Sequence, residues 1–135
     1  MKHYSMLTTD YLDSLDIPIV KDGKTKCEYL NIESAFDIET TSTIYNGEKS
    51  AFMYVWMFGI GYGNDVFYGR TWEEFLNLCE LLGAYFDLHE NKRLITYVHN
   101  LGYEFQFMRK FFKWEGVFSI DERKPIKALC DMGIE

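Results

Sequence analysis

Apolar side chains recur in short runs through the middle of the chain, and their spacing predicts three consecutive β-strands. The first spans residues 27–40, with apolar side chains at Leu30, Ile32, Ala35, Phe36 and Ile38. The aromatic stretch AFMYVWMFGIGY, residues 51–62, predicts a long second strand, and VFYGR, residues 66–70, predicts a third. Between the first two strands, the polar residues 40–50 predict a turn, with Asn46-Gly47 as its hairpin signal.

The spacing changes to a helical period after the third strand. A helix is predicted over residues 71–90, because apolar side chains recur on one helical face at Phe75, Leu78, Leu82 and Tyr85. Thr71 and Glu74 have the spacing of a capping box at its start.

The rest of the chain predicts one more strand, one more helix and two short strands. The strand covers residues 93–100, RLITYVHN, and the helix covers residues 101–114, with Asn100 as its N-cap. The final strands cover residues 116–121 and 125–131.

The order of these elements predicts an α/β fold. A three-stranded meander followed by alternating helices and strands suits a mixed sheet covered by helices, and it is the opening order of the ribonuclease H-like fold. Residues 1–28 alternate poorly and predict an N-terminal arm or loose hairpin before a domain of residues 29–135. The fold is expected to be incomplete at the C-terminus.

Composition narrows the function classes. The chain has 135 residues, of which 47% are hydrophobic, so it can bury the core of one domain. The net charge of −7 argues against a general nucleic-acid coat, although it leaves room for a local site of carboxylates and metal. Three scattered cysteines and an acidic N-terminus favour reduced thiols in a cytoplasmic protein with no membrane span.

Two acids close the first predicted strand. Asp37 and Glu39 are two positions apart, so on a strand they point to the same face. A divalent cation between them would remove the repulsion of like charges. The alternative is a solvated strand end, which is the commoner explanation of a lone Asp-x-Glu.

A second polar group opens the helix after the fourth strand. Asn100 and Glu104 are four positions apart and would share one helical face. The alternative is structural, with Asn100 as an N-cap and Glu104 as an acid favoured by the helix dipole. Nearby aromatic side chains would then belong to the core.

The two groups together resemble the first two motifs of the DEDD 3′–5′ exonuclease superfamily, Asp-x-Glu and Asn-x-x-aromatic-acid. DIETT and YVHNLGYEFQF are similar to the proofreading domain of protein-primed family B DNA polymerases of phages and mobile elements. In that family Tyr and His precede the Asn and an aromatic follows the acid, as Tyr97, His99 and Phe107 do here. The similarity runs from about residue 30 to the C-terminus.

The chain departs from this family at two points. Glu104 stands where the second motif usually has Asp. The third motif, Tyr-x-x-x-Asp or His-x-x-x-x-Asp, cannot be written downstream, because no Tyr follows Tyr103 and His99 is the last His. The expectation is therefore an N-terminal piece of a larger polymerase, with little or no activity by itself.

The resemblance implies a two-metal site for Mg²⁺ or Mn²⁺ that hydrolyses single-stranded DNA from its 3′ end. Asp37 would bridge both metals, Glu39 would bind one, and Glu104 would act on the other through water. Implied contacts to the DNA end are those of Thr40, Tyr97, His99, Asn100, Tyr103 and Phe107.

The resemblance also implies partners and a location. The partners would be the terminal protein and the rest of the polymerase chain, in the cytoplasm of a bacterial host. The alternative function is a non-catalytic ribonuclease H-like module that binds single-stranded DNA or a protein partner.

Overall fold

The computed structural model places most of the chain in helices and strands packed around one apolar core. It describes residues 1–21, 23, 27–61, 65–98, 101–108, 111, 114–119, 125–130 and 134. Within these residues the fold is mixed α/β, as the sequence predicts.

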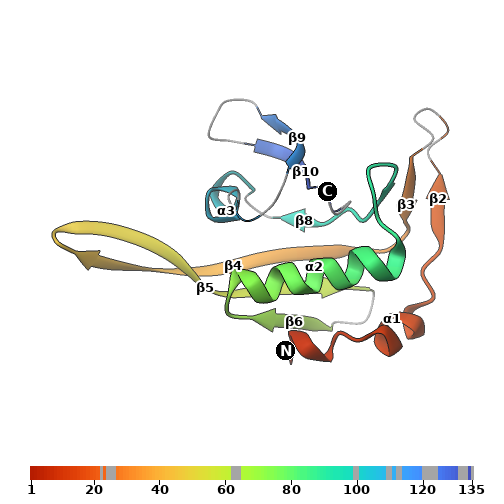
Figure 1. Ribbon diagram of the computed structural model, residues 1–135, viewed down its shortest axis with the longest axis horizontal. Coiled ribbons are helices and arrows are strands. Elements are labelled where there is room, and N and C mark those ends of the chain that lie inside the picture. Colours follow the sequence, from red (N-terminus) through yellow and green to blue (C-terminus); the bar gives the residue numbers. More distant parts are fainter. Residues whose placement is uncertain are drawn as a thin grey trace.

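A five-stranded mixed sheet forms the centre of the molecule (Figure 1). Its order is β1-β6-β5-β4-β8, with the bounds Lys2–His3, Val66–Gly69, Glu48–Ile60, Ser34–Tyr45 and Tyr97–Val98. β4, β5 and β6 form an antiparallel meander, whereas β8 pairs with β4 in parallel and β1 pairs with β6 in parallel. The predicted three-stranded meander is therefore present.

The predicted turn at residues 40–50 is wrong in extent. β4 continues to Tyr45 and β5 begins at Glu48, so only Asn46 and Gly47 turn, with φ values of 51° and 80°. Both positive φ values suit a tight hairpin turn between twisted strands. The polar stretch before it is rich in Thr, whose branched side chain favours strands. The two strands extend beyond the body of the sheet as a ribbon (Figure 1).

The first predicted strand is also divided. Residues 27–40 contribute to two strands, β3 (Glu28–Leu30) and β4, because the chain bends at residues 31–33. β3 joins a second mixed sheet of order β2-β3-β7, in which β2 covers Ile19–Lys21 and β7 covers Lys92–Arg93. The predicted fourth strand at residues 93–100 is likewise shared between β7 and β8.

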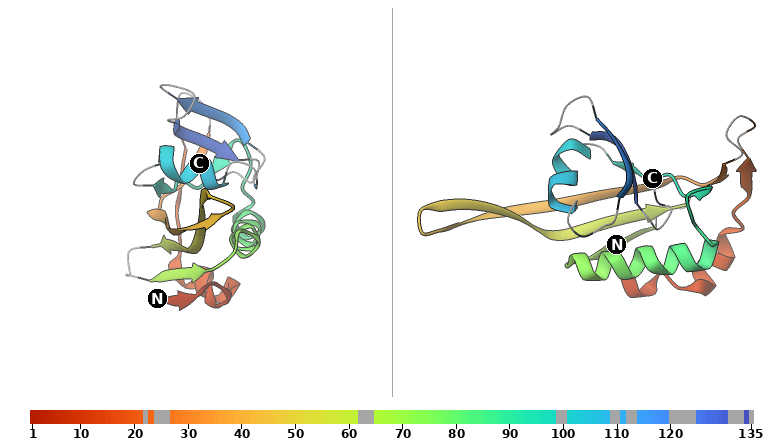
Figure 2. Two further views of the ribbon diagram at one scale, coloured as in Figure 1. Left: turned by 90° about the vertical axis from the view of Figure 1, so that its left-hand side faces the viewer. Right: turned by 45° about the horizontal axis from the view of Figure 1, so that its top comes forward.

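Helix α2 (Trp72–Phe86) covers one face of the central sheet (Figure 2). It begins as predicted, since the Thr71 side chain accepts a hydrogen bond from the Glu74 amide at 3.2 Å. The indole of Trp56 donates to the Thr71 carbonyl at 2.9 Å and so ties β5 to the start of the helix. Phe36 stacks on Phe75 of the helix at 4.3 Å between ring centres, in the middle of the core.

The N-terminal residues differ from the predicted arm or loose hairpin. They include the 3-10 helix η1 (Tyr4–Met6) and α1 (Thr9–Leu15), as well as an antiparallel pairing of β2 with β3. Thr8 caps α1 by accepting from the Tyr11 amide, and Leu12 is buried in the core. The Tyr11 ring packs edge-on against Phe67, so this segment covers the outer side of β6.

After β8 the chain forms α3 (Leu101–Met108) and a separate antiparallel pair, β9 (Trp114–Ser119) and β10 (Pro125–Cys130). Both short final strands agree with the sequence prediction to within a few residues. In the described part of the chain, no helix has the length and apolar character needed to cross a membrane.

Candidate functional site

Strand β4 directs its two acids away from α2. Phe36 and Ile38 are buried in the core, whereas Asp37 and Glu39 alternate with them and are exposed on the opposite face. This is the arrangement that the Asp-x-Glu spacing predicts for a strand with one covered face.

Helix α3 brings Glu104 to the same strand. Within the described residues, β8 pairs with β4 through Ala35 and Phe36, and Ile38 lies two positions further along β4. There the backbone amide of Ile38 donates to Asp37 Oδ1 at 2.9 Å and to Glu104 Oε1 at 3.3 Å. Two carboxyl groups that are 67 positions apart in sequence therefore share one donor.

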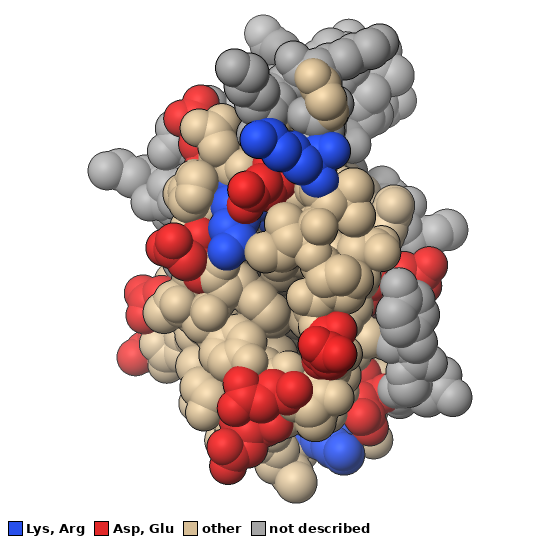
Figure 3. All heavy atoms as spheres, turned by 90° about the vertical axis from the view of Figure 1, so that its right-hand side faces the viewer, with Lys and Arg blue, Asp and Glu red and all other residues tan. Residues whose placement is uncertain are grey.

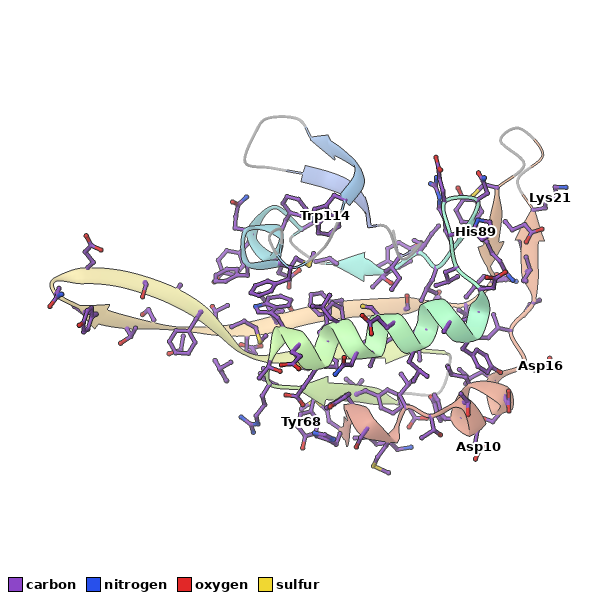
Figure 4. All side chains as sticks on the ribbon, in the orientation of Figure 1. Asp10, Asp16, Lys21, Tyr68, His89 and Trp114 are labelled. Carbon is purple, nitrogen blue, oxygen red and sulfur yellow. The ribbon has the colours of Figure 1, made fainter. Side chains whose placement is uncertain are left out.

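Aromatic contacts hold α3 in this position. Phe105 packs on Trp114 with 4.9 Å between ring centres (Trp114 is labelled beside α3 in Figure 4), and Met108 is buried. Phe111, just after the helix, stacks on Trp72 at the first residue of α2. The position of Glu104 is thus fixed by packing of the second half of its helix and the residue after it, not by the carboxylate contact alone.

The Glu104 carboxyl group is buried and favours its protonated form. Glu104 as a whole is 3% exposed. Burial, then hydrogen bonding to Asp37 and the Asp37 charge, together raise its pKa from an ordinary value near 4.5 to about 8, against a smaller opposing effect of the Ile38 amide. At neutral pH the Glu104 carboxyl group therefore keeps its proton, and its hydrogen bond to Asp37 replaces the repulsion of two charges.

One atom of this pair lacks a partner. Glu104 Oε2 is buried and makes no hydrogen bond within the described residues. A buried oxygen of this kind is costly unless something binds it. Carboxylate oxygens are the ligands that Mg²⁺ and Mn²⁺ prefer, so Asp37 and Glu104 fit a divalent cation that would displace the shared proton.

Glu39 does not complete a preformed three-carboxylate group. It lies on the same face of β4 as Asp37, but among the described residues no three His, Cys, Asp or Glu side chains converge. The structure thus brings together two of the three predicted acids and leaves the third beside them on the strand.

Two of the residues predicted to bind DNA contact each other next to the acids. The hydroxyl groups of Thr40 and Tyr103 are 2.7 Å apart, which joins β4 to α3 a second time. The Tyr103 ring packs edge-on against Phe107, one turn along the helix, at 5.1 Å. His99 and Asn100 lie outside the described residues.

An open cavity of about 440 Å³ runs across the sheet beside Asp37, on the face opposite α2. Its lining comes from four strands and is apolar apart from the Asp37 carboxylate: Ala35, Phe36, Asp37, Met57, Gly59, Val66, Tyr97 and Val98. Tyr97 is 66% exposed at its edge.

The contribution of β5 and β6 to this cavity was not predicted from the sequence. Gly59 was the available signal, since a glycine inside an aromatic strand marks a place where another group approaches the backbone.

Searches against protein-family models, curated proteins and solved structures find no match to this chain.

Proposed function

We propose that this chain is the exonuclease portion of a protein-primed family B DNA polymerase, acting on single-stranded DNA 3′ ends. The observation that carries the proposal is the meeting of Asp37 and Glu104 at the Ile38 amide. These acids belong to the two motifs on which the family resemblance is based. The strand order β6-β5-β4-β8 supports the proposal too, because a meander beside a parallel fourth strand suits the ribonuclease H-like fold.

Asp37, Glu39 and Glu104 would hold the divalent cations of this reaction. Bound cations would activate water and offset the charge on the phosphate that is cleaved. Before a cation can bind, Glu104 must lose the proton that it shares with Asp37. Its pKa of about 8 makes this loss incomplete at neutral pH, so cation binding should be stronger above pH 8.

The remaining residues of the site would hold the DNA end. The paired hydroxyl groups of Thr40 and Tyr103 are placed to bind sugar or phosphate beside the acids. The exposed ring of Tyr97 offers a stacking surface for a base, and the apolar cavity next to it could receive a nucleoside. Such contacts would position the last phosphate against Asp37.

The runner-up is a ribonuclease H-like module that binds single-stranded DNA without cutting it. The observation in its favour is that Glu39 does not join Asp37 and Glu104 in a preformed group. The family's third motif is also not found in the sequence, so hydrolysis by this chain should be slow.

A binding measurement tests the proposal directly. Fluorescence anisotropy would follow a 5′-fluorescein dT12 oligonucleotide with and without Mn²⁺. We expect Mn²⁺ to tighten binding at least tenfold. Asp37→Asn should abolish this gain, whereas Asp87→Asn, the same charge change at the exposed C-cap of α2, should preserve it. Binding that ignores Mn²⁺, or that Asp37→Asn leaves intact, would overturn the proposal.

Hydrolysis separates the two candidates. With protein in excess over labelled dT12 and Mn²⁺ present, the exonuclease predicts slow, stepwise shortening from the 3′ end that Asp37→Asn removes. Mn²⁺-dependent binding with no shortening over many hours would favour the non-catalytic module instead.

A further inference from the structure

We propose that the extended part of the β4–β5 hairpin, residues 40–53, is a track for single-stranded DNA leading away from the acids. This segment is named the ribbon below. The inference rests on the proposed function, since it assigns the path of the DNA strand whose 3′ end lies at Asp37. Beyond Thr40 and Thr41, which belong to the DIETT motif, it concerns residues that none of the recognised motifs includes.

The ribbon continues the face of β4 that carries the acids. Because side chains alternate along a strand, Thr41, Thr43 and Tyr45 follow Asp37 and Glu39 on one face. Cross-strand pairing adds Phe52 opposite Thr41, and Ser50 opposite Thr43. The face therefore presents hydroxyl groups interspersed with two aromatic rings, in direct line with the candidate site, and one acid, Glu48, opposite Tyr45 at its tip.

The two rings on this face are exposed without contributing to the core. Tyr45 is 76% exposed and Phe52 is 47% exposed. Figure 1 shows the ribbon projecting beyond α2 and the rest of the sheet. Exposed rings on a projecting hairpin cost solubility and add little stability, so a binding role accounts for them better than a structural one.

Few charges lie along the ribbon. The chain has 21 acids, but residues 40–64 hold only Glu48, which lies opposite Tyr45 at the tip of this face, whereas Lys49 pairs with Ile44 on the other face. In contrast, Asp10, Asp13 and Asp16 are exposed on and after α1, and acids are spread over the end of the molecule away from the ribbon (Figure 3). A DNA strand that leaves the site along the ribbon would thus avoid most of the molecule's negative charge.

Unpaired bases stack on exposed aromatic rings, and phosphates accept hydrogen bonds from hydroxyl groups. The ribbon face presents both kinds of side chain. From Asp37 to Tyr45 the strand rises about 26 Å, at ~3.3 Å per residue. At ~3.4 Å per stacked base this distance corresponds to roughly eight nucleotides. A trinucleotide would therefore fill only the site, whereas a dodecanucleotide would also reach Tyr45.

Oligonucleotide length gives the test. Anisotropy with 5′-fluorescein dT3 and dT12 in Mn²⁺ should show dT12 bound at least tenfold more tightly. The double variant Tyr45→Ala/Phe52→Ala should lose this advantage and leave dT3 binding unchanged. Ile44→Ala is the matched control, because Ile44 is 73% exposed but points to the other face of the ribbon. Thermal melting would verify that all variants fold.

The outcomes distinguish the track from the proposed function. If Asp37→Asn abolishes Mn²⁺-dependent binding of dT3 but the double variant keeps the full dT12 advantage, the function stands and the track is wrong. If binding is independent of Mn²⁺ and the double variant still loses the dT12 advantage, the track stands and the function is wrong. A double variant that binds both oligonucleotides normally, but is monomeric where the wild type is dimeric, would assign the ribbon to a contact between copies and overturn the track.

Discussion

Asp37 and Glu104 meet at one backbone amide, although one lies on a strand with its side chain exposed and the other on a helix with its side chain buried. The shared donor, the Ile38 N–H, lies two residues beyond the Phe36–Val98 pair that joins β4 to β8. The contact makes β4 and α3 parts of one site. It also joins two groups that would repel each other if both were ionised.

The shared proton predicts an unusual dependence of stability on pH. The pKa of Glu104 is about 8 in the folded protein and near 4.5 when the side chain is exposed, so the folded state holds a proton that the unfolded state releases between these values. The contribution of Glu104 to the free energy of unfolding is therefore greatest below pH 4.5 and is lost as pH rises to 8. The loss should be on the order of 2–5 kcal/mol.

Urea unfolding at several pH values, without metal, measures this contribution. Glu104→Gln keeps the shape of the protonated side chain but cannot ionise. As pH rises from 5 to 8.5, the free energy of unfolding of Glu104→Gln should therefore increase relative to that of the wild type. A difference that stays constant over this range would mean that Glu104 is ionised throughout and that the shared proton does not exist.

The hydroxyl contact between Thr40 and Tyr103 should affect DNA binding more than folding. Tyr103→Phe keeps the ring against Phe107 and removes one hydrogen bond near the surface, so unfolding should change by no more than about 1 kcal/mol. If the pair positions the DNA end, dT3 affinity in Mn²⁺ should fall several-fold.

Tyr85→Phe is the control for that experiment, because it also removes one phenol hydrogen bond, to Asp13, from a different part of the molecule. Equal losses of dT3 affinity in the two variants would show that the Tyr103 effect is not specific to the site.

Gly69 should be essential for the packing of the core. It pairs with Trp56 across β5 and β6, and a Cβ atom there would lie inside the contact distance of the buried Trp56 indole. Gly69→Ala should therefore destabilise the fold by about 1–3 kcal/mol, as overpacking of a core does. Gly23→Ala, at a glycine with open space around it, should change the melting temperature little. Equal melting temperatures for the two variants would contradict the described packing.

Local patterns in the sequence were sufficient to predict the parts of the fold that depend on neighbours along the chain. The capping residues Thr71 and Glu74 correctly placed the start of α2, and the spacing of Asp37 and Glu39 correctly predicted their common face. α1 was missed because TDYLDSL is short and acidic, and depends on burial of Leu12 against the core.

The rest depended on contacts that no local pattern encodes. Residues 40–50 look like a turn because they are polar, but pairing with β5 makes nearly all of them strand. Similarly, the meeting of Glu104 with the Ile38 amide joins residues 66 positions apart, which no local spacing indicates. The bulge in the β4–β5 pairing between Glu39 and Thr40 was not predictable either, because it lies within continuous strands.

Mn²⁺ binding measured by electron paramagnetic resonance at pH 8.5 tests the central claim, that the Asp37–Glu104 pair is a metal site. The wild type and Asp87→Asn should deplete the free Mn²⁺ signal to the same extent, because Asp87 is remote from the pair on the C-cap of α2. Asp37→Asn and Glu104→Gln should each leave the protein folded and weaken Mn²⁺ binding at least tenfold. Equal Mn²⁺ binding by all four proteins would contradict the claim and make the carboxyl pair a structural contact.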